Sequence, residues 1–445
     1  MLKRTLLVCT VLAFSSTLTA QPITPGPINV TLLAEITAKG QKVNGVALEY
    51  EDELFSSSDL TEVYQVATSL DQQAAEKRTV LRAYTYHQPA LSNHATSGRF
   101  VIVELDTRDA NADLYALKTE NEQPIKVRAK DTAGQIVKVE KVQKTQVPQY
   151  YRERLEYQIA QTGIVKLLNG KSLAKTTLKR TALSQYVKTP YLDDFVVKQV
   201  ALTEPENRLS YNFYAAKDQT DKRPLTIFLH GSGQVGTDNI AHLLSSKGAI
   251  STLQYEDGFV LAPQYGTIFD PFDDVNKGQR GGVHWQTENR QRLLLKMIDQ
   301  TLSENPAIDR NRIYLVGLSR GAEGALNLLQ KRPYFFAAAL LMSGREANTL
   351  DWIDGNATVE SLRALKDEPI WFFHSPQDKV SPLSGSTVNY RILKNKLNAP
   401  NVKYTELYFS QAGDSGIINA NAHNTWDLVF NSPTVLQWLL QQRLK

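Results

Sequence analysis

Cysteine is almost missing from this sequence, because the only one among 445 residues is Cys9. Disulfide bonds, zinc–thiolate sites and a cysteine nucleophile are therefore excluded for the rest of the chain. Charge of one sign is also scarce, since the formal net charge is only +4. A bias this weak argues against nucleic acid or anionic lipid as a partner. No metal and no other cofactor is expected, and nothing in the sequence indicates an oligomeric state.

Long apolar runs are lacking after the N-terminus, where no segment reaches about 18 apolar residues, so no transmembrane helix is expected. The N-terminus carries Lys3 and Arg4, an apolar stretch over 6–14, and small residues up to Ala20. This pattern is typical of a secretory signal peptide, and the apolar stretch is too short for a membrane anchor. We predict residues 1–20 to be a signal peptide and the mature protein to be secreted or periplasmic.

Glycine and proline, at 24 and 18 residues, are too few for a collagen-like or low-complexity chain. Hydrophobic residues make up 42% and charged residues 22%, which are ordinary fractions for a globular protein. At roughly 100–200 residues per domain, the length suits two or three domains, each with its own core.

The first part of the chain has the pattern of β-strands, with turn residues between them. The predicted strands cover 29–36, 45–50, 79–86, 100–106 and 134–141. A β-sandwich follows from this pattern. A helix is predicted over 150–160 and an extended connector over 171–188. We assign residues 21–190 to this all-β domain with its connector, and find no catalytic constellation in it.

From about residue 191 the pattern changes to alternating strands and helices. Strands are predicted at 225–230, 259–263, 312–316, 336–342 and 369–374, and helices at 287–302, 322–330, 386–397 and 433–444. Several strands are continuous apolar runs, as expected for strands buried on both faces. Residues 191–445 are therefore predicted to form one α/β domain, a mostly parallel sheet covered by helices on both faces.

The most informative segment is Gly317-Leu318-Ser319-Arg320-Gly321, which fits G-x-S-x-G. It follows a predicted strand and precedes a predicted helix, which is the context of a nucleophile elbow. The turn lifts the serine hydroxyl above the sheet edge, and glycine is needed where a Cβ would clash. We predict Ser319 to be a nucleophile.

A serine hydroxyl reacts only with a base to take its proton, and here the expected chain order is serine, acid, histidine. Only His374 and His423 follow Ser319. Because His374 precedes every good acid candidate, His423 is the predicted base.

The acid should lie between nucleophile and base, just past the carboxyl end of a strand. Asp378 meets this condition, and it would accept a hydrogen bond from the base and fix its tautomer. Asp351 and Asp354 fall in a loop or at a helix start, and Asp367 precedes its strand. Asp414, in a glycine-rich loop, stays open as the alternative.

An oxyanion hole needs two backbone N–H donors. One is expected from Arg320, the residue after the nucleophile. The other should come from Ser232 or Gly233, in the glycine-rich turn 230–233. His230 is expected to shape this turn by hydrogen bonding and to do no chemistry.

The long segment 266–282 is expected to overhang the site as a partial lid. Phe269 and Phe272 in it, together with Trp285, are candidate substrate contacts. The segment also holds three aspartates: Asp270, Asp273 and Asp274. Their spacing does not match an EF-hand loop, so a solvated acidic turn is predicted rather than a calcium site.

Residues 191–445 resemble the α/β-hydrolase superfamily, and within it a group of secreted bacterial esterases described as predicted peptidases or phospholipase/carboxylesterase-like proteins. The segments that carry the likeness are 224–233, 236–239, 261–264, Trp285, 374–382 and 423–426. The chain departs from the family pattern at Ala322, where a second glycine is common, and at Ser375, where glycine is common. Residues 100–105 and 191–214 resemble the immunoglobulin-like (Ig-like) domain that precedes the hydrolase in some secreted thermostable esterases.

These observations and the resemblance lead to one expected function. The protein is expected to be a secreted serine carboxylester hydrolase with a Ser-His-Asp triad and an acyl-enzyme intermediate, acting on a small-molecule or polymer ester. Two alternatives stay open. One is a serine peptidase with the same triad, and the other is a polymer-binding protein with a silent hydrolase fold.

Overall fold

The computed structural model describes residues 26–120, 124–142, 144–173, 175–180, 187–273 and 281–444. The predicted signal peptide, residues 1–20, lies outside them. The chain divides into two compact units. The first comprises the described parts of Met1–Thr31, Gly45–Asp106 and Glu156–Arg180, and the second comprises Leu32–Asn44, Thr107–Leu155 and Thr181–Lys445. None of the helices described is both long and apolar enough to cross a bilayer.

The first unit is built of strands. These are β2 (Gly40–Leu54), β3 (Tyr64–Leu70), β4 (Glu76–Arg78), β5 (Val80–Tyr86), β6 (Gly98–Leu105), β11 (Leu155–Gln161), β12 (Val165–Lys166), β13 (Ser172–Leu173) and β14 (Thr176–Arg180). Strands β2, β6 and β5 are neighbours in one sheet, and a second sheet has the order β14-β11-β3-β4. The all-β architecture predicted for this part of the chain is therefore present.

The helix predicted over 150–160 is wrong. This stretch contains the end of β10 (Thr145–Tyr150), a single 3-10 turn at Arg152–Arg154, and strand β11. Leu155, Tyr157 and Ile159 are buried while the residues between them are partly exposed. This period of two is that of a strand with one buried face. The expected connector 171–188 also forms part of the sheets, because β14 pairs antiparallel with β11.

The second unit begins with short strands and hairpins. They are β1 (Asn29–Thr37, which runs on from the first unit), β7 (Tyr115–Glu120), β8 (Pro124–Lys130), β9 (Ile136–Val142), β10 (Thr145–Tyr150) and β15 (Val187–Lys188). β7 pairs antiparallel with β10, and β8 with β9.

An eight-stranded sheet forms the centre of the second unit, in the order β16-β17-β19-β18-β20-β21-β22-β23. Its strands are β16 (Val196–Ala201), β17 (Arg208–Tyr214), β18 (Arg223–Leu229), β19 (Phe259–Gln264), β20 (Ile308–Leu318), β21 (Ala338–Met342), β22 (Ile370–His374) and β23 (Val402–Glu406). From β19 to β23 all neighbours are parallel, whereas β17 runs antiparallel to β19 and β16 to β17.

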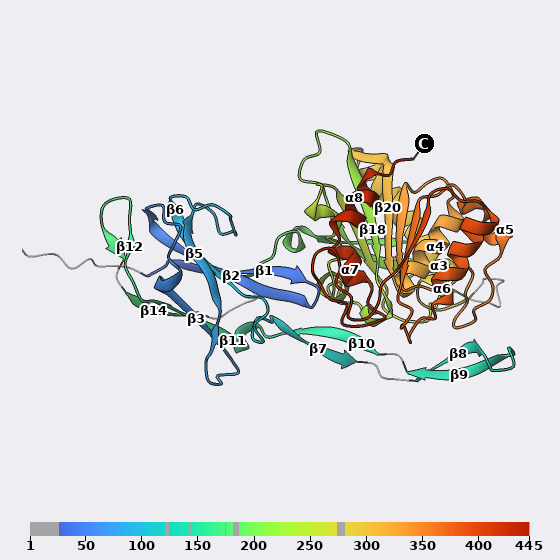
Figure 1. Ribbon diagram of the computed structural model, residues 1–445, viewed down its shortest axis with the longest axis horizontal. Coiled ribbons are helices and arrows are strands. Elements are labelled where there is room, and N and C mark those ends of the chain that lie inside the picture. The colour runs from blue at the N-terminus through green and yellow to red at the C-terminus, as the bar shows by residue number, and fades with distance from the viewer. Residues whose placement is uncertain are drawn as a thin grey trace, which may run out of the picture. The chain divides into compact units, whose positions relative to one another are not determined.

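Helices cover both faces of this sheet, with α3 and α4 on one side and α7 and α8 on the other (Figure 1). The helices of the unit are α2 (Ala241–Leu244), α3 (Glu288–Glu304), α4 (Arg320–Lys331), α5 (Val359–Leu362), α6 (Ser384–Arg391), α7 (Trp426–Phe430) and α8 (Pro433–Gln441). α6 continues as a π-helix over Ile392–Lys396. The predicted mostly parallel sheet with two covered faces is therefore confirmed.

Successive side chains of each central strand point to opposite faces of the sheet, so the interior has two hydrophobic cores. In β20, Ile313 and Leu315 face the core that contains α3 and α4, while Tyr314 and Val316 face the core of α7 and α8. Because successive side chains point to opposite faces, strands covered on both sides are apolar throughout. Their carboxyl ends meet at one edge of the sheet, and the loops after β18, β19, β20, β22 and β23 carry the predicted site residues.

Candidate active site

Ser319 stands at the sharp turn between β20 and α4. Its backbone has φ of 51° and ψ of −120°, a conformation that non-glycine residues rarely adopt. The flanking glycine Gly321 is required sterically, because a Cβ there would lie 1.9 Å from the carbonyl oxygen of Leu229. The turn therefore has the strained strand–helix geometry of a nucleophile elbow, with the serine at its apex.

The structure brings the three predicted triad residues together. The Oγ of Ser319 lies 3.1 Å from Nε2 of His423, and Nδ1 of His423 lies 2.7 Å from Oδ2 of Asp378. Both distances are within hydrogen-bond range. The carboxylate accepts at Nδ1, so the neutral ring presents an unprotonated Nε2 to the serine hydroxyl. The serine is thus aligned with a base, and the base with an acid.

Asp378 is the most tightly held member of this group, with a side chain that is 0% exposed. Its Oδ1 accepts from the backbone N–H of Val380 at 2.7 Å and of Ser381 at 3.0 Å. Its Oδ2 faces His423 and a second histidine, His374. Burial alone would raise the pKa of Asp378, but the hydrogen bonds from His374 and His423 outweigh it and hold this pKa well below its ordinary value. The acid is therefore an anion at every working pH.

The rival acids have other partners. Asp414 accepts a hydrogen bond of 2.7 Å from the hydroxyl of Ser432. Asp351 accepts one of 2.9 Å from Nε of Arg128, and Asp354 pairs with an arginine. The carboxylate next to His423 is that of Asp378, so the structure favours it over Asp414.

The turn after β18 lies beside the nucleophile. A Cβ on Gly231 would come 2.8 Å from Cδ1 of Leu318 and 3.2 Å from the Cβ of Ser319, so glycine allows the close approach of the two turns. Ser232 and Gly233 begin a 3-10 turn, and Arg320 begins α4. Gly233 and Arg320 both lie in the first turn of a helix, where backbone N–H groups have no acceptor within the helix itself. They are therefore available to a ligand.

Trp285 is buried against this turn. The prediction that Trp285 contacts substrate is therefore corrected. Its side chain is 0% exposed, and its indole N–H donates to the carbonyl of His230 at 2.9 Å. His230 in turn lies with Nδ1 2.7 Å from the Gly231 carbonyl. Burial, and then the nearby His242, lower the pKa of His230 to about 3, so the ring stays neutral. A structural role for His230 agrees with these contacts.

The side chain of Arg320 is buried behind the nucleophile, a feature with no sequence signal of its own. It donates to Glu323 at 2.8 Å and to the carbonyl of Asp351 at 3.1 Å, and it stacks on Trp352. Gln286 donates to the same Glu323 oxygen at 2.9 Å. Burial raises the pKa of Glu323, and the charge of Arg320 opposes that rise. This network fixes the residue whose backbone N–H faces the site.

The loop expected to act as a lid is only partly described, because 274–280, including Asp274, lie outside the described residues. Phe269 is 46% exposed and Phe272 is partly buried, and both stay candidate substrate contacts. The solvated acidic turn predicted here is wrong for Asp270. Its side chain is only 4% exposed, and it is paired with Arg290 at 3.6 Å. That pair anchors the described end of the loop to α3.

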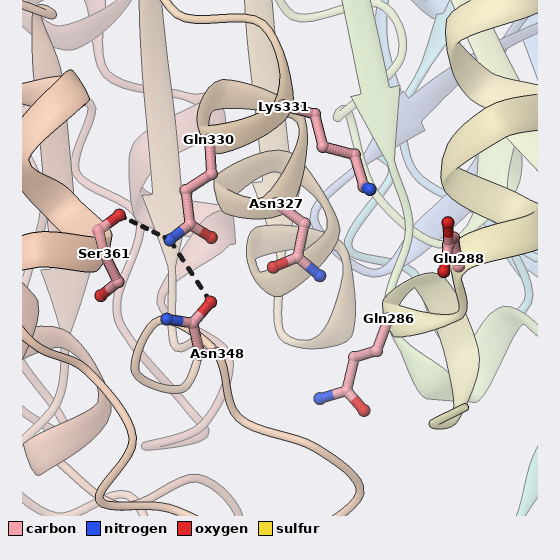
Figure 2. Close-up of a pocket in the computed structure, with 7 residues that line it drawn as sticks. All are labelled: Gln286, Glu288, Asn327, Gln330, Lys331, Asn348 and Ser361. Carbon is pink, nitrogen blue, oxygen red and sulfur yellow. Dashed lines mark hydrogen bonds between the residues drawn. The ribbon is translucent and has the colours of Figure 1, made fainter. Parts of the chain in front are cut away.

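A separate polar pocket of about 240 Å³ lies along the C-terminal half of α4 (Figure 2). Its lining residues are Gln286, Glu288, Asn327, Gln330, Lys331, Asn348 and Ser361. Gln330 donates to the carbonyl of Ser361 at 2.9 Å, which ties α4 to the start of α5. None of the lining residues belongs to the triad or to the oxyanion turn. Among the described residues, no group of three or more His, Cys, Asp or Glu could hold a metal ion.

Comparison with known proteins gives a family match for the N-terminal part of the chain and a match of fold for nearly all of it. Residues 29–174 match the family described as the esterase Ig-like N-terminal domain. No curated protein matches the sequence. A solved thermostable esterase shares 24% identity, with a TM-score of 0.70, over 94% of this chain and 100% of its own. Esterase PE8 shares 20% identity over 49% of this chain and 96% of its own, with a TM-score of 0.34. Est1E from Butyrivibrio proteoclasticus shares 15% identity over 55% of this chain and 98% of its own, with a TM-score of 0.35.

The first of these likenesses covers nearly the whole chain and shows its fold. The protein has an Ig-like N-terminal domain followed by a domain with the α/β-hydrolase fold, which is the fold class predicted from the sequence.

Proposed function

We propose that this protein is a serine carboxylester hydrolase that works through Ser319, His423 and Asp378. The observation that carries the proposal is the unbroken hydrogen-bonded line from the Ser319 hydroxyl to the Asp378 carboxylate, 3.1 Å and 2.7 Å long. A silent hydrolase fold has no need of a strained serine facing an oriented base. A polymer-binding protein without activity is therefore the weaker alternative.

In the proposed reaction, His423 removes the proton from Ser319 as Oγ attacks the ester carbonyl. The C–O bond to the alcohol then breaks, and His423 returns the proton to the departing alkoxide. This leaves the acyl group on Ser319. Water, deprotonated by the same imidazole, attacks the acyl-enzyme and releases the acid. The His423 side chain is 14% exposed, so water can reach it.

The negative charge of each tetrahedral intermediate would rest on two backbone donors. One is the N–H of Arg320, at the N-terminus of α4, where the helix dipole also favours negative charge. The other is the N–H of Ser232 or Gly233. Trp285 and the ion pair of Arg320 with Glu323 hold these donors in place before substrate arrives. Donors fixed in advance stabilise the transition state without reorganisation.

The substrate proposed is a small-molecule or polymer ester outside the cytoplasm. The support for that location is the signal-peptide pattern of residues 1–20. Mass spectrometry of the mature protein would test it, since the proposal expects an N-terminus at Gln21.

A substrate screen tests the activity and separates it from peptidase activity. p-Nitrophenyl esters of increasing acyl length are compared with aminoacyl p-nitroanilides, using the wild type and Ser319→Ala. The proposal expects ester hydrolysis that the variant loses by roughly 10³–10⁶-fold in kcat, with anilides poorly cleaved. Anilides cleaved faster than esters would favour the peptidase, and equal activity in both proteins would exclude Ser319.

A further inference from the structure

The carboxylate oxygen that binds the base has a second partner. Oδ2 of Asp378 lies 2.7 Å from Nδ1 of His423 and 3.3 Å from Nε2 of His374. The other oxygen is occupied by two backbone N–H groups. Backbone N–H groups therefore bind Oδ1 of Asp378, and two imidazole rings face its Oδ2.

The contacts of His374 show where its proton lies. Nε2 is 3.1 Å from the carbonyl oxygen of Ser381, which can only accept, so Nε2 carries a hydrogen. That hydrogen lies between the carbonyl and Oδ2 of Asp378. In the tautomer that carries its hydrogen on Nε2, Nδ1 accepts from the hydroxyl of Ser386 in α6 at 2.8 Å. A chain of contacts therefore runs from Ser386 through His374 to the Asp378 carboxylate, which Nε2 approaches at 3.3 Å.

This arrangement differs from that of the other buried histidines of the second unit. His230, His242 and His284 are, like His374, 0% exposed. Each of those three keeps one ring nitrogen without a hydrogen-bond partner. His374 has partners at both nitrogens, and the partner it shares is the triad acid. Partners at both nitrogens are usual for a buried histidine, and what distinguishes His374 is that its Nε2 also faces the carboxylate of Asp378.

We infer that His374 is a positioning residue for the reaction, which holds the Asp378 carboxylate in the rotation that points Oδ2 at His423. The inference rests on the proposed function. His374 closes the acid off from water, because its ring covers Oδ2 at a site that is 0% exposed. It also sets how strongly the carboxylate attracts the proton on His423, since each donor to an anion lowers its basicity.

Without this donor, Oδ2 keeps His423 as its only partner, and Oδ1 is held by the two backbone N–H groups. Rotation about the Cβ–Cγ bond of Asp378 then moves Oδ2 away from Nδ1 of His423, and the base loses its orientation. A displacement of about 1 Å in a catalytic group costs up to about 10²-fold in rate. Substrate binding does not involve His374, because the ring is buried under the acid loop. The loss should therefore fall on kcat rather than on KM.

Two substitutions of similar volume separate this role from simple packing. Gln at position 374 places an N–H donor the same number of bonds from Cα as the Nε2 of histidine, whereas Leu has none. His374→Leu should lower kcat for a p-nitrophenyl ester by roughly 10–100-fold with KM little changed. His374→Gln should recover to within about threefold of the wild type, because the donor is restored.

The pH profile is the second measurement. The acid limb of kcat/KM reports protonation of the catalytic base in the free enzyme. With the donor gone, the more basic carboxylate holds the proton on His423 more tightly. The midpoint of the acid limb should therefore shift to higher pH, by roughly half a pH unit in His374→Leu and by much less in His374→Gln. A packing defect would lower the folded fraction without moving this limb. Equal kcat values for the two variants, or an unmoved limb in His374→Leu, would overturn the inference.

A milder pair of variants keeps the test decisive if His374→Leu does not fold. Ser386→Ala removes only the hydroxyl facing Nδ1 and should lower kcat about fivefold. Thr387→Val is its matched control on the next residue of α6, where the hydroxyl donates to the Leu383 carbonyl. The control should leave kcat unchanged. Equal kcat in both variants would contradict the role of His374.

Failure of the proposed function gives a different result. If the wild type hydrolyses no ester and behaves like Ser319→Ala, both proposals fall together. If the wild type is active, Ser319→Ala is inactive and the His374 variants match the wild type, only the inference about His374 is overturned.

Discussion

Replacing Asp378 by asparagine keeps the shape of the side chain and reverses the hydrogen bonding at one atom. Oδ1 receives two backbone N–H groups, at 2.7 and 3.0 Å, so the amide oxygen of Asn must take that place. The NH2 group then occupies the position of Oδ2 and points a donor at Nδ1 of His423. His423 must accept there, which moves its proton to Nε2, the atom that faces Ser319.

In that tautomer the imidazole cannot take the serine proton. The loss of kcat should be on the order of 10⁴-fold, as for other triads in which the wrong tautomer is imposed. This corresponds to about 5 kcal/mol of transition-state stabilisation. KM should change little, because Asp378 is buried and does not touch substrate.

The assay is steady-state hydrolysis of a p-nitrophenyl ester at pH 7.5, after circular dichroism has shown that the variant is folded. Asp414→Asn is the matched control, because Asp414 bonds Ser432 and not the base. Its kcat should stay within about twofold of the wild type. More than a tenth of the wild-type kcat in Asp378→Asn would refute the reasoning, and so would a large loss in the control.

Three further substitutions test other parts of the structure. Burial raises the pKa of Asp427 from 3.8 to about 7, which means that the fold favours the neutral carboxyl. The free energy of unfolding that this group contributes is fully present below pH 3.8 and is lost as pH rises through about 7. Asp427→Asn should therefore be the more stable protein at pH 8, by at most about 4 kcal/mol in urea unfolding, and the gap should close towards pH 4. Trp285→Phe leaves the His230 carbonyl without its donor, and should cost about 1–3 kcal/mol of stability and also lower kcat. Phe269→Ala should raise KM for aromatic esters with little change in Tm; an unchanged KM would remove Phe269 from the substrate contacts.

The three residues proposed as the triad could be predicted from the sequence to lie together, because each is tied to a local pattern. Ser319 lies in a five-residue motif between a strand and a helix, and Asp378 follows the carboxyl end of an apolar strand. Strand ends of a parallel sheet meet at one edge, so residues far apart in sequence converge there. His423 was identified by elimination, because only His374 and His423 come after Ser319 and His374 precedes the acid.

Other features depend on packing that the sequence does not show. From the sequence, Trp285 is grouped with the aromatic residues of the expected lid, yet its side chain is 0% exposed and donates to the His230 carbonyl. His374 was rejected as the base on chain order, which says nothing about its contact with the acid four residues later. The strand at 155–161 was taken for a helix, although Leu155, Tyr157 and Ile159 alternate with polar residues.

The most direct test of the account is covalent labelling of the intact protein with a fluorophosphonate, followed by peptide mapping by mass spectrometry. Such a probe reacts with a serine only where a base and an oxyanion hole activate it. The account predicts one phosphonylated residue, Ser319, and loss of labelling in Ser319→Ala and His423→Ala. An unlabelled wild-type protein, or a label on another serine, would contradict it.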